Sequence, residues 1–407
     1  MRYDVCIVGA GLVGLSVGRA VLEKYPGSSV VLLDKEAGVA AHQSSHNSGV
    51  AHSGLYYRPG SLKARLCVEG RAELERLCDS ASIPFRRLGK LVIATDSAEL
   101  EALDELERRG RANGLTGLRR LDLAGIREIE PAATGLQGLH VPEAGVVDFP
   151  GVAAHLAAEL QRNGAEVRTG LEVTAIDHEA DGARIVAGDQ EVRARIMVNC
   201  AGLHSDRVAA LAGVESDIRI VPFRGEYYTL DPEVSHLVKG LVYPVPDPRF
   251  PFLGVHFTRR VDDSVEVGPN AVLALGREQY RGSPIGWGDL REVMALRGFW
   301  KLAGRHWLTG GAEIFRSKSR ALYARSAQRL IPALRSDHLG QGGVGVRAQA
   351  LGRDGRLVDD FVIEEVGATL HVLNAPSPGA TASLAIGAHI AGLLRPQLTG
   401  LAGGRGV

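Results

Sequence analysis

The pattern of hydrophobic and polar positions at the start of this chain predicts a β-α-β unit. Residues 3–8 (YDVCIV) form a short apolar run rich in strand-forming residues, and a helical pattern follows in residues 15–25 (LSVGRAVLEKY). After a Pro-Gly turn, residues 29–33 (SVVLL) form a second apolar run, which ends at Asp34. Two strands and a helix within about thirty residues are the unit that binds the diphosphate of a dinucleotide.

The same pattern predicts the elements that follow. Residues 37–59 are polar and rich in Gly, Ser and His, and a loop of this length is usually functional. We expect helices over 62–82, 97–114 and 149–163, and strands over 89–95, 165–168, 171–177, 183–187 and 194–202. Residues 218–275 contain several β-like runs, 288–335 are mainly helical, and the chain closes with strands up to Leu373, a Pro/Gly turn and a terminal helix.

This order of elements predicts an α/β fold of two domains. A Rossmann-type domain would be assembled from discontinuous segments, residues 1–85, 150–212 and 345–407. A mixed α+β substrate domain would take residues 86–149 and 213–344. A length of 407 residues agrees with two domains.

Composition narrows the class of protein. Lys+Arg and Asp+Glu are both 47, so the protein has no net positive charge that would attract a nucleic acid. The cysteines lie in apolar segments without CxxC spacing, which indicates reduced core thiols and a cytoplasmic location. The terminal helix is apolar enough to touch a membrane from its inner face, although packing against the first domain explains the same residues and is favoured here.

Three glycines carry the first chemical signal. Gly9, Gly11 and Gly14 form a G-x-G-x-x-G turn between a strand and a helix: the first permits the reversal, the second lets a diphosphate approach, and the third permits close packing. Asp34, at the end of the next strand, is placed to accept hydrogen bonds from ribose hydroxyls and to repel a 2′-phosphate. The cofactor is then FAD or NAD, and a glycine turn without any nucleotide is the alternative.

The spread of motifs over the chain favours FAD. The glycine turn lies at the N-terminus, VNCAG (198–202) lies near the middle of the chain, and NAPSPGATAS lies near its end. Motifs this far apart in sequence are typical of a domain that is assembled from distant segments around an extended cofactor. These motifs, with HNSGVAHSGLYYRPGSLKARLCVEG (46–70), PFRGEYY, PFLGVHFTR, GVRAQ and NAPSPGATASLAIG, resemble the L-2-hydroxyglutarate dehydrogenase/oxidase family. That family belongs to the D-amino-acid oxidase and glycerol-3-phosphate dehydrogenase group of flavoenzymes.

The resemblance implies FAD-dependent oxidation of the dicarboxylate L-2-hydroxyglutarate to 2-oxoglutarate, with electrons passed to oxygen, a quinone or another acceptor. Another 2-hydroxy acid, glycerol 3-phosphate or an N-methyl amino acid is the alternative substrate, and a non-catalytic flavin-binding protein is the alternative class. The predicted cofactor contacts are Gly9, Gly11, Leu12, Val13, Gly14, Asp34, Lys35, Ser44, Ser45, His46, Ser48, Gly49, Val173, Ala201, Gly202, Gly379, Ala380 and Thr381.

Hydride transfer from a hydroxy acid needs a base for the hydroxyl proton and cations for the carboxylates. By likeness to the glycerol-3-phosphate dehydrogenases, His52 faces the flavin as the base; packing of the loop is its alternative role. His256 is a second candidate base or an ordinary half-buried residue. Arg347 can hold a carboxylate bidentately, and a surface arginine is its alternative.

Weaker candidates complete the predicted site. Tyr57 and Tyr243 either line the pocket or pack in the core, and Arg224 is either a carboxylate ligand or the structural partner of Glu226. The histidines at 42, 46 and 52 lack ligand spacing and supporting Cys or carboxylate residues, so the sequence predicts no metal site.

Overall fold

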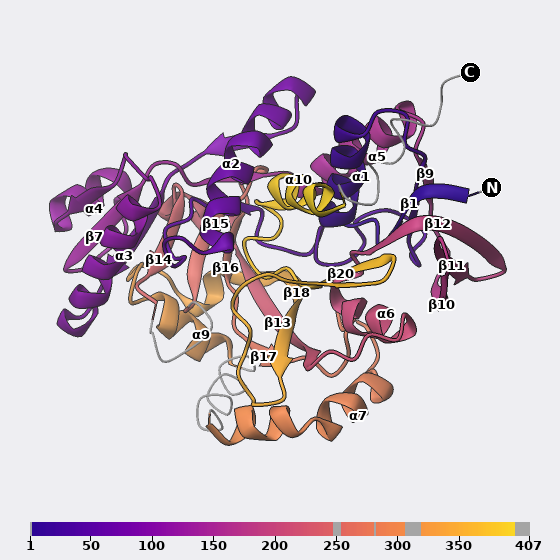
Figure 1. Cartoon of the computed structure of the whole chain (residues 1–407). Coiled ribbons are helices and arrows are strands. Elements are labelled where there is room, and N and C mark those ends of the chain that lie inside the picture. The colour runs from indigo at the N-terminus through magenta and orange to yellow at the C-terminus, as the bar shows by residue number, and fades with distance from the viewer. Residues whose placement is uncertain (1, 247–253, 281, 306–318, 395–407) are drawn as a thin grey trace.

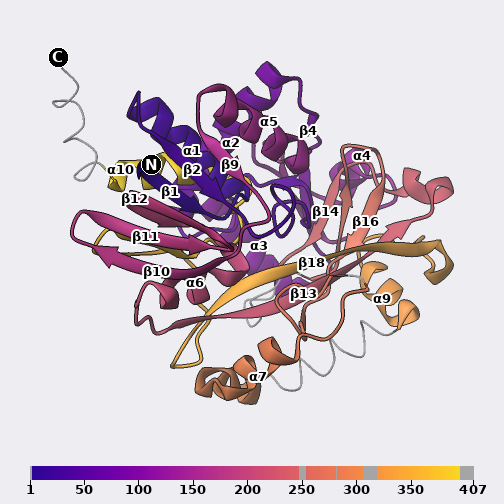
Figure 2. The same cartoon turned by 90° about the vertical axis from the view of Figure 1, so that its right-hand side faces the viewer.

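The computed structural model describes residues 2–246, 254–280, 282–305 and 319–394. Within them the chain forms two large sheets that lie side by side, each covered by helices (Figures 1 and 2). The predicted Rossmann-type domain and the mixed second domain are both confirmed. The expected helical segment 288–335 lies partly outside the described residues, as does the run PFLGVHFTR.

The first sheet is built around parallel strands in the order β20-β12-β1-β2-β9. β10, β11 and β19 extend it by antiparallel pairing. Its strands are β1 (Arg2–Val8), β2 (Val30–Leu33), β9 (Glu166–Arg168), β10 (Val173–Glu179), β11 (Gly182–Ala187), β12 (Gln190–Asn199), β19 (Val362–Val366) and β20 (Thr369–Asn374). Three distant segments of the chain therefore meet in one sheet.

The second sheet is mainly antiparallel, with a parallel β5-β14 pair near one end. Its strands are β5 (Lys90–Ala94), β6 (Arg119–Leu121), β7 (Gln137–Val141), β13 (Ile218–Leu230), β14 (Leu241–Pro244), β15 (His256–Arg259), β16 (Val265–Gly268), β17 (Val272–Leu273) and β18 (Leu339–Gly352). β13 and β18 are its longest strands and pair along their whole length (Figure 2). The predicted domain boundary at residue 345 falls inside β18. A small third sheet joins β3 (Val50–Ala51), β4 (Phe85–Arg87) and β8 (Gly145–Val147).

Helices flank these sheets. They are α1 (Leu12–Lys24), α2 (Leu62–Ala81), α3 (Leu100–Ala112), α4 (Leu123–Ile129), α5 (Phe149–Arg162), α6 (Ser205–Leu211), α7 (Trp287–Ala295), α9 (Arg320–Ala327) and α10 (Ser383–Leu393). Short 3-10 helices span Ser97–Glu99, Gly202–His204, Pro232–Leu237 and Ser336–His338. No helix in the described part of the chain is long and apolar enough to cross a membrane.

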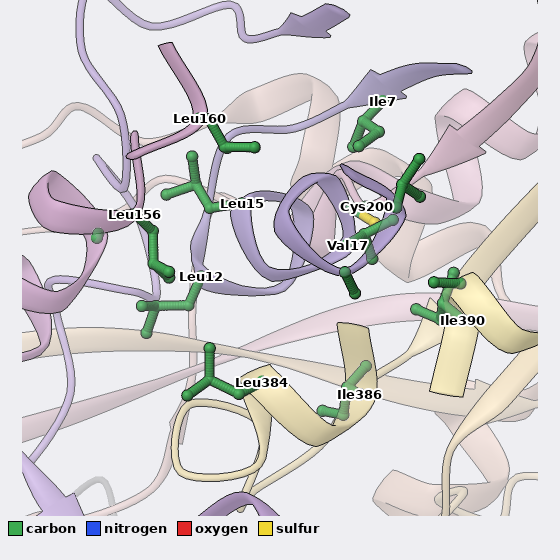
Figure 3. Packing of buried hydrophobic residues seen from close by; sticks show 14 of the residues in the cluster. Ile7, Leu12, Leu15, Val17, Leu156, Leu160, Cys200, Leu384, Ile386 and Ile390 are labelled. Carbon is green, nitrogen blue, oxygen red and sulfur yellow. The ribbon is translucent and has the colours of Figure 1, made fainter. Parts of the chain in front are cut away.

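The core of the first domain surrounds α1, which lies between α5 and α10 (Figure 3). Leucines of α5 and isoleucines of α10 pack on the two sides of the helix, and the other face of the sheet packs on α6 and the β10-β11 pair. At Gly387 a Cβ would lie 2.4 Å from the carbonyl carbon of Ser16, so only glycine permits this approach of α10 to α1. The terminal helix therefore packs inside the domain, as the sequence favours.

Candidate active site

The glycine turn opens into a cavity at the N-terminus of α1. Gly9 has φ +104°, a conformation that favours glycine, and a Cβ on Gly14 would lie 1.9 Å from the Gly9 carbonyl oxygen. α1 begins at Leu12 after an N-cap, Gly11, that offers no side-chain hydrogen bond, and its first turn contains no acidic residue. The positive end of the helix dipole and its amides thus face the cavity, as an anion-binding site requires.

Asp34 connects the second strand to this turn. Its Oδ2 accepts a hydrogen bond of 2.7 Å from the backbone amide of Ala10, and its Oδ1 accepts one of 2.9 Å from the amide of Glu36. The carboxylate also lines the cavity, and each of its oxygens has a lone pair left to accept a further hydrogen bond. Asp34 therefore fixes the glycine turn in addition to the predicted contact with ribose.

The cavity has a volume of about 1560 Å³ and runs from the glycine turn to the second sheet. It exceeds the roughly 300–1,000 Å³ of most small-molecule sites. Of the predicted cofactor contacts, its lining includes Gly9, Gly11, Leu12, Val13, Asp34, Lys35, Ser44, His46, Ser48, Val173, Ala201, Gly202, Gly379, Ala380 and Thr381. The two sheets thus enclose one continuous space.

Four predicted site residues lie outside this lining, each for a local reason. Gly14 packs against Gly9, and the amide of Ser45 donates to the carbonyl of His42 within a turn. Gly49 accepts a hydrogen bond from the Val147 amide, which joins β3 to β8. Tyr57 hydrogen-bonds to Ser377, and burial raises the pKa of its hydroxyl well above the usual value.

His52 borders the cavity directly after β3. Its backbone is fixed by two contacts: its amide donates to the Thr381 hydroxyl at 3.1 Å, and the Cys67 thiol donates to its carbonyl oxygen. The Nδ1 atom is buried and has no hydrogen-bond partner among the described residues, so this nitrogen makes no hydrogen bond to the loop. Burial lowers the pKa of His52 well below its usual value, and Lys90 and His256 add to the effect. The imidazole is neutral at pH 7.

His256 and Tyr243 form a stacked pair in the same wall of the cavity. Their ring centroids are 3.9 Å apart and the planes are inclined by 22°. His256 is 4% exposed, Tyr243 is 1% exposed, and both line the cavity. Burial lowers the pKa of His256 to about 3, against the opposing effect of its hydrogen bond with the Gly254 carbonyl. His256 is therefore a second neutral imidazole beside His52.

Arg347 enters from β18 and lies against Tyr227 of the neighbouring strand. It is half-buried and lines the cavity, as the predicted carboxylate ligand would. Tyr227 lies where the pairing of β13 with β18 shifts register, and such irregularities re-aim side chains. Burial raises the pKa of the Tyr227 hydroxyl, while the nearby Arg347 guanidinium, which is hydrogen-bonded to it, opposes the effect. Together the two residues offer an anion several donors.

Sequence reasoning missed three residues near this end of the cavity. Tyr227 belongs to the PFRGEYY motif, but the alternation of side chains along a strand does not reveal the register shift that turns it toward Arg347. Lys63 lines the cavity and donates to the carboxylate and carbonyl of Asp359, both at 2.9 Å. Lys90 is the first residue of an apolar strand, where a lysine usually indicates an exposed strand end.

Arg224, the weaker candidate for a carboxylate ligand, forms an ion pair with Glu226, as its alternative structural role predicts.

Charged residues gather at the opposite end of the cavity. Oxygen and nitrogen atoms of Glu36, His42 and Glu278 lie within 4.8 Å of one another. The Lys35 ammonium contacts both carboxylates, at 2.6 Å from Glu278, so a cation of the protein already balances this cluster. The hydrogen bond from His204 lowers the pKa of Glu278 to about 2, together with the contact to Lys35. These contacts tie Glu278 to the first domain.

Comparisons with known proteins place this geometry in a family. Residues 4–393 match the family model of the FAD-dependent oxidoreductases called DAO. The chain therefore belongs to the DAO family of FAD-dependent oxidoreductases, and the predicted cofactor FAD is confirmed. Among solved structures it is similar in fold to L-α-glycerophosphate oxidase from Mycoplasma pneumoniae with FAD bound (TM-score 0.78, 22% identity, 98% of this chain and 95% of that chain). It is also similar to glycine oxidase from Geobacillus kaustophilus (TM-score 0.73, 19% identity, 97% and 95%).

Curated relatives agree with one another in name. The L-2-hydroxyglutarate dehydrogenase of Indibacter alkaliphilus is 46% identical over 388 residues, covering 95% of this chain and 97% of that protein. The mitochondrial L-2-hydroxyglutarate dehydrogenase of Homo sapiens is 43% identical over 406 residues, covering 96% and 88%. The predicted family resemblance is thus confirmed at identities far above those of the structural neighbours.

The residues of the cavity fit FAD. The first turn of α1 contains no acidic residue, its Leu12 amide donates to the Ser44 hydroxyl at 3.0 Å, and the Asp34 carboxylate stands at the end of the adjacent strand. A Cβ at Gly11 would lie 3.0 Å from the Ser44 hydroxyl, so a side chain at this position would crowd the space that a diphosphate needs. The cavity then continues to the histidines and Arg347, which leaves room for a small substrate at that end.

Proposed function

We propose that this protein oxidises L-2-hydroxyglutarate to 2-oxoglutarate. The observation that carries the proposal is the meeting of two neutral imidazoles, His52 and His256, with Arg347 at one end of a cavity built for FAD. Relatives over nearly the whole chain are named for this substrate. FAD, when bound, supplies the acceptor for the hydride that leaves C2.

The side chains of this chain would then bind the substrate and move one proton. The Arg347 guanidinium holds a carboxylate in fork geometry, and the hydroxyl of Tyr227 adds a donor beside it. An unprotonated ring nitrogen of His52 accepts the proton of the C2 hydroxyl, because a neutral imidazole is the best base available here near pH 7. The stacked rings of Tyr243 and His256 form the wall that fixes the substrate's position.

The test is a half-reaction. Purified protein should be yellow from bound FAD, and L-2-hydroxyglutarate added without oxygen should bleach it while releasing one 2-oxoglutarate per flavin. If the protein is yellow but none of the candidate substrates bleaches it, the protein binds flavin without catalysing the reaction. A protein that another hydroxy acid or glycerol 3-phosphate bleaches, and L-2-hydroxyglutarate does not, would contradict the proposed substrate only.

We propose oxygen or a quinone as the electron acceptor, with peripheral contact at a membrane as the route to a quinone. Exposed apolar side chains on and beside α7 support this: Ile285 (40%), Trp287 (71%), Met294 (40%) and Trp300 (55%). The exposed cations Arg291 and Lys301 lie among them, while Glu292 is paired with Arg207. Exposed tryptophans beside cations suit an anionic membrane surface.

Vesicle sedimentation checks the membrane contact. The protein should sediment with vesicles containing anionic lipid and remain in solution with neutral ones, and a Trp287→Ser, Trp300→Ser variant should lose the difference. If wild type and variant sediment equally, this surface does not bind membranes, and the electron acceptor is oxygen or another dissolved molecule.

A further inference from the structure

Lys90 is a buried amine to which no residue in the described part of the chain provides a counter-charge. It is the first residue of β5 and is 1% exposed. No described residue offers its Nζ a hydrogen bond. An isolated ammonium costs several kcal/mol to bury, so a lysine that only fills space here would be replaced by an apolar side chain at a gain in stability.

The surroundings of Lys90 place it directly behind the proposed substrate end of the cavity. Its Nζ lies 4.1 Å from the centroid of the Tyr243 ring and 5.1 Å from that of Tyr56. Since the His256 imidazole covers one face of Tyr243 at 3.9 Å, the amine must lie on the other face. Lys90, Tyr243 and His256 therefore form a stack that ends in the cavity wall.

Within the described residues, titratable groups from several elements surround Lys90, while its partner on the paired strand β7 is the apolar Val141. They are Tyr56 and His52 of the loop region after β3, Cys67 of α2, Tyr243 of β14 and His256 of β15. None of them is a carboxylate. Burial lowers the pKa of Lys90 to about 7, and the positive charge that Lys90 carries lowers the pKa of His52 in turn.

We propose that Lys90 is a positioning residue for the reaction: its amine takes up a proton when a dianion enters the cavity, and the resulting charge attracts the second carboxylate through the aromatic wall and adds to the effect of burial that leaves His52 unprotonated. This inference rests on the proposed function, because it needs a substrate with two carboxylates. Arg347 serves one carboxylate directly, and Lys90 acts on the other from behind the aromatic wall. A nearby anion favours the charged form of an amine, which is the physical origin of the proton uptake.

Proton uptake on binding is the test, with Lys90→Met and Lys90→Arg as the variants. 2-Oxoglutarate is titrated into FAD-loaded protein at pH 8 by calorimetry in buffers of different ionisation enthalpy. Wild type should take up a fraction of a proton per ligand. Lys90→Met should take up none and bind on the order of tenfold more weakly. Lys90→Arg should also take up none, but should bind nearly as wild type does, because a guanidinium keeps its charge.

Two further measurements separate this role from a structural one. Lys90→Met should unfold at a higher temperature than wild type, since it removes an unpaired buried amine. The kcat/KM of wild type should fall between about pH 7 and 8 because KM rises while kcat stays constant. Lys90→Met should lack this alkaline fall. Proton uptake that persists in Lys90→Met, with unchanged affinity, would overturn the role of Lys90. Wild type that neither binds 2-oxoglutarate nor is bleached by L-2-hydroxyglutarate would instead overturn the proposed substrate and this inference with it.

Discussion

The Asp34 carboxylate accepts a hydrogen bond of 2.7 Å from the backbone amide of Ala10, which lies inside the glycine turn. Asp34→Ala should therefore weaken FAD binding in two ways, by loss of the ribose contact and by release of the turn. We expect a loss of roughly 1.5–3 kcal/mol in FAD affinity, as for a hydrogen bond to a charged group. Flavin fluorescence titration of the apoprotein measures it, with the exposed Asp189→Ala as control. Equal affinity in Asp34→Ala and wild type would remove Asp34 from the cofactor site.

Gly11→Val should abolish flavin retention. A Cβ at Gly11 would lie 3.0 Å from the Ser44 hydroxyl, and the valine methyl groups would fill the space beside the N-terminus of α1. The ratio of flavin to protein absorbance after purification measures the effect. Gly38→Val is the matched control, because nothing lies within 4 Å of a Cβ there. A fully yellow Gly11→Val protein would contradict the placement of the diphosphate.

His52→Asn should keep its flavin and lose turnover by roughly 10² to 10⁴-fold, the range for a positioned general base. Because the pKa of His52 is lowered, wild-type kcat/KM should fall in acid as the imidazole takes up a proton, separately from the alkaline limb assigned to Lys90; the His52→Asn variant should lack this acidic limb. The exposed His236→Ala is the control. Should the limb survive in His52→Asn and vanish in His256→Ala, the two histidines have the opposite roles.

His371 should make the protein acid-sensitive. Its Nδ1 accepts from the Asn199 amide at 3.2 Å, so a second ring proton would oppose that donor, and burial lowers its pKa to about 4. The unfolded chain binds the proton near pH 6.5, so this stability is complete above pH 6.5 and is lost as the pH falls toward 4. The free energy of unfolding should drop by about 3 kcal/mol from this group between pH 7 and 4.

Urea unfolding of the FAD-loaded protein at pH 7 and 4.5 checks this linkage. His371→Gln should show a smaller loss of stability on acidification than wild type, and the exposed His236→Gln should show the wild-type loss. The same acid sensitivity in His371→Gln and wild type would show that other groups titrate in this range.

Arg347→Lys should lose much of kcat/KM although the charge is preserved. A guanidinium positions a carboxylate through two parallel hydrogen bonds, and misplacement of the substrate by about 1 Å costs on the order of 10²-fold. Steady-state kinetics separates the effects: misalignment lowers kcat, whereas loss of binding alone raises KM. Arg353→Lys, at an exposed ion pair with Asp217, is the control. Unchanged kinetics in Arg347→Lys would exclude a bidentate role.

Much of the first domain could be predicted from sequence, because its elements are long and their period is clear. The helix at Leu12–Lys24, the strand at Val30–Leu33 and the terminal helix all lie within a few residues of their predicted positions. The strands at Arg119–Leu121 and Gly145–Val147 are only three residues long and gave no periodic signal. Leu339–Gly352 escaped prediction as one strand because its glycines interrupt the alternation of side chains.

The site could be predicted where motifs are local and not where distant strands create it. His52, His256 and Arg347 stood in recognisable motifs, and the fold brings them to one cavity. The burial of Lys90 depends on Tyr243, more than 150 residues away in sequence, and no local pattern announces that contact. The stacking of His256 on Tyr243 likewise arises between two strands of the second sheet.

The most direct test of the account is the rate of flavin reduction by different substrates in the absence of oxygen. In a site with Arg347 for one carboxylate and a second cationic region for the other, the flavin should be reduced by L-2-hydroxyglutarate far faster than by L-lactate, D-2-hydroxyglutarate, glycerol 3-phosphate or sarcosine. L-Lactate and sarcosine lack the second carboxylate, glycerol 3-phosphate has neither, and D-2-hydroxyglutarate turns its C2 hydrogen away from the flavin when both carboxylates are bound. Stopped-flow absorbance at equal substrate concentrations measures all five rates. L-2-Hydroxyglutarate at the head of the series is the result we predict, and faster reduction by any of the other four would contradict the proposed substrate.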